Sequence, residues 1–149
     1  MPAKNITTST LLRRIFKTAN IMGFVRHYNE QMMVVPFKHY INRLCVDKDT
    51  VPERIILKSG IERTYGHQIF NGTRKPSRDK VIQLAFGFEL DYDETQNLLR
   101  AARKSALYPK IDRDAIVIYA LNKRLDLSNV QATLKELSLP VLGKEDKYE

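Results

Sequence analysis

Apolar residues recur at helical spacing along most of the chain, and no stretch shows the sustained alternation of apolar and polar residues that marks a strand. In the first 35 residues, Thr10 can cap a helix that runs to about Thr18. The next segment, residues 20–33, is ambiguous because Gly23 weakens its helical pattern. The apolar positions of these two segments are Leu11, Leu12, Ile15 and Phe16, and then Phe24, Tyr28, Met32 and Met33.

From Pro36 onward the pattern predicts five short helices. The first carries the stripe Phe37, Tyr40, Ile41, Leu44 and Cys45. Thr50 and Glu53 have the spacing of a capping box and predict a helix to about Ser59, where Gly60 supplies a positive φ that ends it. A third helix spans about 63–70 and stops at Asn71-Gly72. Ser77 caps a fourth helix, and Asp91 with Glu94 caps a fifth.

Two further helices are expected after Pro109. One covers about 113–123 and contains the apolar run Ala115–Leu121, and the other begins at Asp126 or Ser128. No internal repeat is evident, although both halves contain helix–turn–helix units. The predicted organisation is a basic helical arm (1–35), a compact five-helix domain (36–105), a helical pair packed on it (106–142) and a charged tail (143–149). The fold class is therefore all-α.

The net charge is +8 over 149 residues, and it is unevenly distributed. Residues 1–35 and 36–90 each carry an excess of four basic residues, whereas residues 91–149 carry ten basic and ten acidic residues. The densest cluster is Arg74-Lys75-Pro76-Ser77-Arg78-Asp79-Lys80. This distribution favours a polyanionic partner for the first 90 residues and leaves the last third for packing or assembly.

The segment Ser59-Gly60-Ile61 to Phe70-Asn71-Gly72 has the spacing of a helix-turn-helix, in which an apolar anchor follows the glycine turn. Together with the run Arg74-Lys75-Pro76-Ser77 and the capped fifth helix, it resembles the lambda-repressor/Cro-like (XRE) helix-turn-helix family over about Phe37 to Arg103. The resemblance implies five helices around one core and a third helix that enters the DNA major groove. Small proteins of this kind commonly bind as symmetric dimers, so we expect a homodimer.

Three positions depart from that family's usual pattern. Ile56 stands where alanine is usual, and Gly66 stands where valine or isoleucine is usual. In that family these positions face each other, so the two changes roughly conserve volume and predict a compensated pair. Glu62 occupies a helix start where Ser, Asp or Asn is usual, which predicts a weak cap.

If Ile69 and Phe70 point inward, the third helix turns a polar face outward. Its side chains are types that read base edges, and the predicted readout residues are Arg63, Thr64, His67 and Gln68. The resemblance implies DNA-backbone contacts from the residues around and beyond this helix: Asn71, Thr73, Arg74, Lys75 and Arg78, with Tyr65 ambiguous between core packing and a phosphate contact. The basic arm with Lys4, Arg13, Arg14, Lys17 and Arg26 can reach along a duplex or pack against the domain or a second subunit.

Candidate chemistry of other kinds is not found in the sequence. The three histidines and Cys45 have no metal-ligand spacing, and the glycine-rich and catalytic motifs of nucleotide-binding and hydrolytic enzymes do not occur. Asp112 and Asp114 are explained by favourable charge at a helix start. We therefore expect no enzymatic activity, no cofactor and no metal. One cysteine and the lack of a signal or membrane-spanning pattern favour a soluble cytoplasmic protein. The family resemblance implies a bacterial or phage protein associated with the nucleoid.

The leading hypothesis is a sequence-specific binder of double-stranded DNA that regulates transcription, most simply as a repressor. The alternative is a protein-interaction module, such as an antitoxin-like or kinase-associated protein, built on the same fold. RNA binding is a weaker third possibility because interleaved exposed aromatic residues are not evident.

Overall fold

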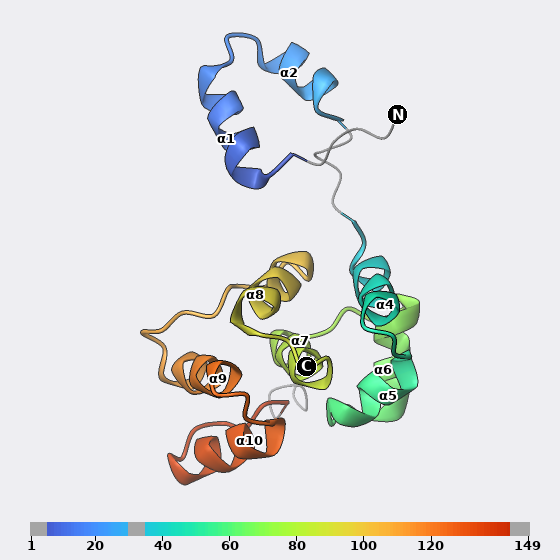
Figure 1. Cartoon of the computed structure of the whole chain (residues 1–149), viewed down its shortest axis with the longest axis vertical. Coiled ribbons are helices and arrows are strands. Elements are labelled where there is room, and N and C mark those ends of the chain that lie inside the picture. Colours follow the sequence, from blue (N-terminus) through green and yellow to red (C-terminus); the bar gives the residue numbers. More distant parts are fainter. Residues whose placement is uncertain (1–5, 30–34, 144–149) are drawn as a thin grey trace. The chain divides into compact units, whose positions relative to one another are not determined.

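The computed structural model describes residues 6–29 and 35–143, and every regular element in these two ranges is a helix (Figure 1). The predicted all-α class is confirmed for this part of the chain. The chain divides into two units, residues 1–35 and 36–149.

The first unit contains α1 (Thr8–Lys17) and α2 (Ile21–His27). Helix α1 begins earlier than expected because Thr7, not Thr10, is the cap: its hydroxyl accepts from the Thr10 amide at 3.2 Å. Arg14 donates to the Tyr28 hydroxyl at 2.7 Å and so links the end of α2 to α1. Helix α2 ends at His27, and the predicted positions Lys4, Met32 and Met33 lie outside the described residues.

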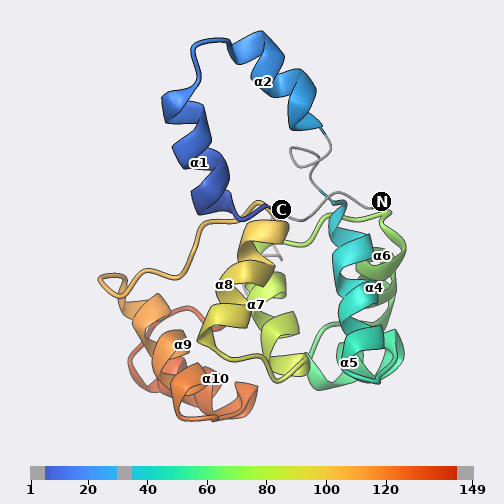
Figure 2. The same cartoon turned by 45° about the horizontal axis from the view of Figure 1, so that its top comes forward.

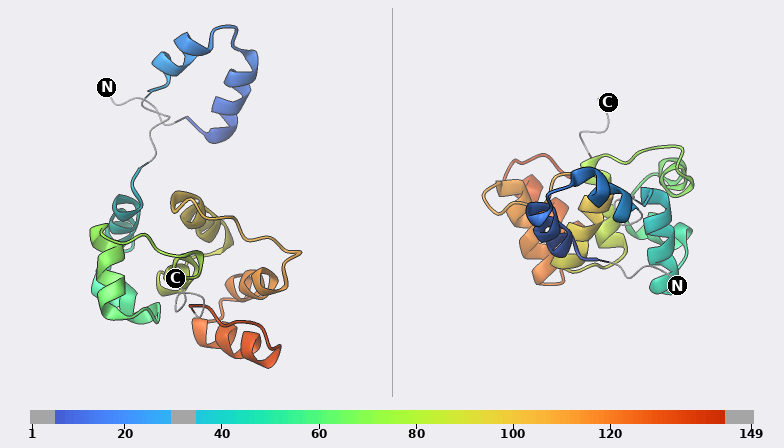
Figure 3. Two further views of the ribbon diagram at one scale, coloured as in Figure 1. Left: turned by 180° about the vertical axis from the view of Figure 1, so that it is seen from behind. Right: turned by 90° about the horizontal axis from the view of Figure 1, so that it is seen from above.

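The second unit has α7 (Arg78–Gly87) and α8 (Tyr92–Ala101) at its centre. On one side lie α4 (Phe37–Asp47), α5 (Pro52–Lys58) and α6 (Arg63–Asn71), and on the other lie α9 (Asp112–Asn122) and α10 (Leu127–Glu136), as Figures 1 and 2 show. The view from behind in Figure 3 shows the same separation of α9 and α10 from α5 and α6. One apolar cluster runs through all seven helices, so the two sides share a core.

Local signals place most helix ends in this unit. Gly60 and Gly72 have φ values of +66° and +84°, Ser77 accepts from the Lys80 amide, and Asp91 forms the predicted capping box with Glu94. The capping box predicted at Thr50 is wrong. Val51 is the N-cap of α5 and makes no side-chain cap, because Pro52 sets the first helical residue one position later than a Thr50 cap requires.

Residues 78–108 (the first hairpin) and 113–143 (the second hairpin) are two copies of one helical unit, 35 positions apart. Left-handed residues end the helices at equivalent places, at Glu89 and Arg124 and again at Arg103 and Ser138. Identical residues at equivalent positions are Arg78 and Arg113, Asp79 and Asp114, Ala85 and Ala120, Leu90 and Leu125, Asp91 and Asp126, Gln96 and Gln131, Leu99 and Leu134, and Leu107 and Leu142. The expectation that the chain holds no internal repeat is therefore wrong.

Hydrogen bonds repeat at the same spacing. The Gln96 side chain accepts from the Leu107 amide at 2.8 Å and donates to its carbonyl at 3.1 Å. Gln131 does the same to Leu142, at 2.8 and 3.0 Å. Each glutamine thus fastens the extended segment that follows the second helix of its own hairpin.

Two buried ion pairs join the hairpins to each other. Arg78 of the first hairpin binds both carboxylate oxygens of Asp114 at 2.9 and 2.8 Å, and Arg113 of the second binds both oxygens of Asp79 at 2.8 Å. Because the contacts are exchanged reciprocally, an approximate two-fold axis relates the hairpins. Asp114 lies in the first turn of α9, as the sequence suggested, but it is only 2 % exposed and also accepts from the Tyr108 amide, so the ion pair is a role that the sequence did not predict.

Candidate nucleic-acid interface

The crossing of α5 and α6 depends on one glycine. A Cβ placed on Gly66 would stand 2.5 Å from Cγ2 of Ile56, closer than real side-chain contacts allow. Ile56 is 2 % exposed and fills the space that a larger residue at position 66 would need. The predicted contact between these two positions is confirmed, and it lets α6 lie close against α5.

Both ends of α6 are fixed to the rest of the unit. Before α6, the Ser59 hydroxyl donates to the Ile55 carbonyl at 2.6 Å, and Gln83 of α7 donates to the Ser59 carbonyl at 3.2 Å. After it, Asn42 of α4 donates to the Phe70 carbonyl at 2.9 Å. Ile61, Ile69 and Phe70 are between 1 % and 6 % exposed, as the helix-turn-helix pattern predicts. Helix α6 is therefore held rigidly with its polar side outward.

The structure brings the four predicted base-reading residues to one side of α6. Arg63 and Thr64 are exposed, whereas His67 and Gln68 are half-buried. Arg63 and His67 share a partner that sequence reasoning missed. Nε of Arg63 lies 3.0 Å from one carboxylate oxygen of Glu53, and Nε2 of His67 lies 2.5 Å from the other. Glu53 belongs to α5, so this contact also ties the two helices together.

Glu53 and Glu62 are two negative charges beside the basic and polar residues of α6. The hydrogen bond from His67, followed by that from Arg63, lowers the pKa of the Glu53 carboxyl below its usual 4.5. The carboxylate consequently stays ionised near neutral pH. Any polyanion that reaches Arg63 and His67 must compete with it.

Glu62 caps α6, contrary to the expectation of a weak cap. Its two carboxylate oxygens accept from the amides of Thr64 and Tyr65 at 2.9 and 2.8 Å. These backbone hydrogen bonds lower the pKa of Glu62 below 4.5. Glutamate can act as the cap because its side chain, although longer than that of aspartate, folds back onto the first turn of the helix. The positive end of the helix dipole favours a carboxylate there.

The residues predicted for the DNA backbone fall into three groups. Asn71 and Thr73 form a local turn, in which Asn71 Oδ1 accepts from the Thr73 amide and hydroxyl at 2.9 and 2.7 Å. The guanidinium of Arg74 lies 3.9 Å from the ring centroid of half-buried Tyr65 and so is held by the ring while it remains exposed. Lys75 is exposed at the tip of the same loop.

Arg78 does not belong with these residues. Besides its two bonds to Asp114, its guanidinium donates to the carbonyls of Ser105 and Ala106 at 3.0 Å. These contacts turn the side chain into the hairpin repeat, so the charge that the sequence assigned to the DNA surface has a structural role. The prediction of Arg78 as a backbone contact is withdrawn for that reason.

Lys38 is a further cation at this surface that sequence reasoning missed. It is exposed near the start of α4, and its side chain crosses the turn after α6, since a Cβ placed on Gly72 would stand 2.5 Å from Lys38 Cδ. The amphipathic pattern of α4 marks Lys38 as outward-facing, but only the packing of α4 on α6 brings it beside Gly72. We define the basic rim as Lys38, Arg74 and Lys75.

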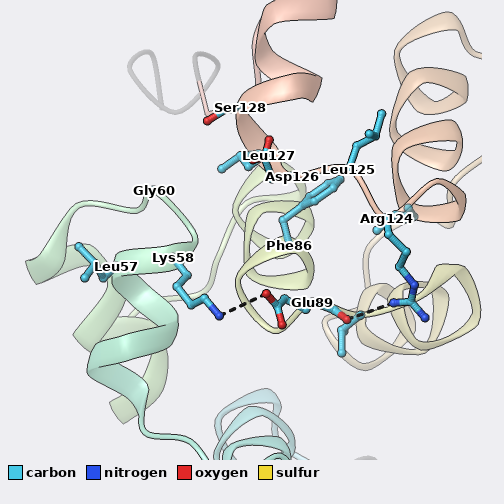
Figure 4. Close-up of a pocket in the computed structure, with 12 residues that line it drawn as sticks. Leu57, Lys58, Gly60, Phe86, Glu89, Arg124, Leu125, Asp126, Leu127 and Ser128 are labelled. Carbon is cyan, nitrogen blue, oxygen red and sulfur yellow. Dashed lines mark hydrogen bonds and ion pairs between the residues drawn. The ribbon is translucent and has the colours of Figure 1, made fainter.

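A groove of about 700 Å³ lies at the junction of α5, α7 and the α9–α10 turn (Figure 4). Lys58 pairs with the Glu89 carboxylate at 3.4 Å, and Arg124 donates to the Glu89 carbonyl at 3.5 Å. Figure 4 shows both contacts converging on the end of α7. These polar contacts hold the two sides of the unit together at this end.

No family model, curated protein or solved structure matches the chain. No group of three or more His, Cys, Asp or Glu side chains that could hold a metal ion occurs in the part of the chain that the structure describes. None of the helices in residues 6–29 and 35–143 has the length and apolar character that crossing a bilayer requires.

Proposed function

We propose that the protein binds double-stranded DNA, with α6 in the major groove, and that it regulates transcription from the bound site. In this proposal α4 to α8 correspond to the five helices of lambda-repressor/Cro-like domains. The observation that carries the proposal is the outward face of α6, whose residues Arg63, Thr64, His67 and Gln68 stand beside the exposed basic rim.

Base and backbone contacts would have separate sources. Thr64 and Gln68 would meet base edges directly, while Arg63 and His67 would exchange the Glu53 carboxylate for base acceptors. Lys38, Arg74 and Lys75 would neutralise phosphates on either side of the groove, with Asn71 and Thr73 shaping the loop. Two copies on paired half-sites would give the symmetric complex common for such proteins.

The second candidate is a protein-interaction module. The observation that favours it is the Glu53 contact, because a surface whose arginine and histidine are already paired to a carboxylate is less suited to a polyanion. The salt dependence of the binding constant separates the two candidates. Binding to DNA releases counterions and weakens steeply as salt is added, whereas binding to a protein partner of balanced charge does not.

The first experiment measures binding of the full chain to a labelled random duplex by fluorescence anisotropy at several salt concentrations. With roughly 5–8 phosphate contacts per dimer, the log–log slope should be about −4 to −7. Absence of binding at low salt, or a flat salt response, would support the protein-interaction module instead.

The second experiment assigns roles within the surface. After selection of a preferred sequence from randomised duplexes, Gln68→Ala should relax preference at one base pair, whereas Lys75→Ala should weaken all duplexes evenly and reduce the salt slope by about one. Lys123→Ala removes an exposed lysine just after α9 and is the matched control for lost charge. If Gln68→Ala and Lys75→Ala act alike, or Lys123→Ala acts like Lys75→Ala, the assignment of roles is wrong.

A further inference from the structure

The second hairpin presents an apolar face on the side away from the first hairpin. It surrounds a hollow of about 240 Å³ between α9 and α10. Tyr119 and Leu125 on this face are 59 % and 38 % exposed, a large apolar area for side chains at the middle of a helical pair. The outer face comprises Ala115, Ile116, Tyr119, Ala120, Leu125, Asn129, Val130 and Thr133.

The first hairpin shows how the equivalent face is covered. Thirty-five positions earlier, the residues equivalent to most of the outer face are at most 3 % exposed: Val81, Leu84, Ala85, Leu90, Thr95 and Leu98. They belong to the core that α4, α5 and α6 complete. Glu94, the equivalent of Asn129 on the outer face, pairs with Lys48 of α4 at 3.3 Å. The same side of the same unit is therefore buried under helices in the first hairpin, whereas in the second it leaves Tyr119, Leu125, Asn129 and Thr133 exposed around the buried Ala120 and Val130.

The charge and shape of the outer face favour a second copy of this chain as its cover. Residues 112–136 carry four acidic and four basic residues, so two such segments can meet without net repulsion, whereas the first 90 residues carry the whole excess of +8. The outer face also combines a projecting Tyr119 with a hollow beside it. A two-fold interface needs a projection and a recess on one patch, because the same patch meets itself.

We propose that two copies of the chain associate through their outer faces, with Tyr119 of each copy packed against the hollow of the other. Tyrosine suits this position because its ring buries a large apolar area while its hydroxyl can remain at the wet edge of the interface. The inference extends the proposed function by naming the surface that pairs two DNA-binding units, and it leaves α6 and the basic rim uncovered.

The test uses the full chain without DNA, in sedimentation velocity runs from about 1 to 100 µM, a range that spans association of ordinary affinity. The unsubstituted chain should sediment as a dimer. Tyr119→Asp should raise the dimer dissociation constant roughly tenfold or more. Thr133→Lys, at an exposed helical position on the rim of the hollow, should do the same without disturbing the core.

Tyr108→Asp is the matched control, because Tyr108 is 52 % exposed and lies outside the outer face. Circular dichroism checks that each variant keeps its helices. A chain that stays monomeric throughout, a dimer that survives both Tyr119→Asp and Thr133→Lys, or equal dissociation by Tyr108→Asp would overturn the proposal. A monomer that still binds DNA would remove this proposal alone, whereas a dimer that ignores DNA would remove only the proposed function.

Discussion

At the scale of single residues, Glu53 would determine how the surface of α6 meets the polyanion of the proposed function. It holds Arg63 and His67 in place, which orders two long side chains before any ligand arrives, and it repels phosphate at the same time. Ordering favours specificity, and repulsion weakens affinity. The balance can be measured because Glu53 takes no part in the core.

Replacing Glu53 with glutamine removes the charge and keeps most of the shape. We expect duplex DNA to bind roughly threefold to tenfold more tightly at low salt, since one like charge is lost beside the phosphates. Discrimination between the selected sequence and random DNA should fall, because Arg63 and His67 lose their ordered partner. Anisotropy titrations measure both quantities. The control is Glu136→Gln, which removes an exposed carboxylate at the end of α10. An equal gain in DNA affinity for this variant would show that only the net charge of the protein matters.

Glu62 gives a second prediction at this scale, through pH. Its pKa in the folded protein lies below 4.5, the value expected when unfolded, so its contribution to stability is complete above pH 4.5 and is lost as pH falls through the lower folded value. Urea unfolding from pH 7 to pH 3 should show the unsubstituted chain more stable than Glu62→Gln at neutral pH, with the difference shrinking below pH 4.5. A difference that stays constant over this range would contradict the carboxylate cap.

At the scale of elements, the separation of α5 and α6 rests on the Ile56 and Gly66 pair. Gly66→Val should destabilise by about 1–3 kcal/mol through overpacking, and Ile56→Ala should destabilise by about 2–5 kcal/mol by leaving a cavity. The double variant should cost less than the sum of the two single changes, since the new valine fills the space left by isoleucine. Thermal melts of the three variants test this, and stabilisation by Gly66→Val alone would refute the packing argument.

Prediction from sequence succeeded where the signal is local to an element. Gly60, Gly72, Ser77 and Asp91 mark helix ends through backbone geometry and short-range hydrogen bonds, which neighbouring residues determine. It failed at Thr50, where two local signals competed and the proline one residue later decided the start of the helix.

The missed features depend on contacts between residues far apart in the chain. In the sequence, the basic cluster around Arg78 looks like one exposed surface. In the structure the Arg78 guanidinium instead turns inward to Asp114, which lies 36 positions later in the chain and cannot be paired with it from local sequence. Glu53 reads as part of a helix cap, and only the crossing of α5 and α6 brings it to His67. The repeat was missed because its identities are scattered among changes such as Leu84 to Tyr119, which alter hydrophobic pattern as well as size.

At the scale of the whole molecule, the reciprocal ion pairs decide where an independently stable part can end. A boundary after residue 105, as the sequence suggested, would remove Arg113, which binds both carboxylate oxygens of Asp79. The same cut would remove Asp114, the ion-pair partner of Arg78 at the start of α7. The α9–α10 pair is therefore tied by ion pairs to the start of α7, the helix that supports the turn before α6 through Gln83.

This predicts large and similar costs for the two carboxylates. Asp79→Ala and Asp114→Ala should each destabilise by about 3–5 kcal/mol, because each removes a buried carboxylate and leaves a half-buried arginine without its counter-charge. Asp112→Ala, at the exposed start of α9, should cost about 1 kcal/mol or less. Urea unfolding of the three variants measures the costs. A small effect at Asp114 with a large one at Asp79 would contradict the symmetric roles of the hairpins.

The reciprocal pairs also set an order of events during synthesis. A chain emerges from the ribosome N-terminus first, so Arg78 and Asp79 appear well before Arg113 and Asp114. Until the second hairpin has emerged, neither Arg78 nor Asp79 has its counter-charge in reach. The two ion pairs between the hairpins can therefore form only late in synthesis, after most of the other helices have been made.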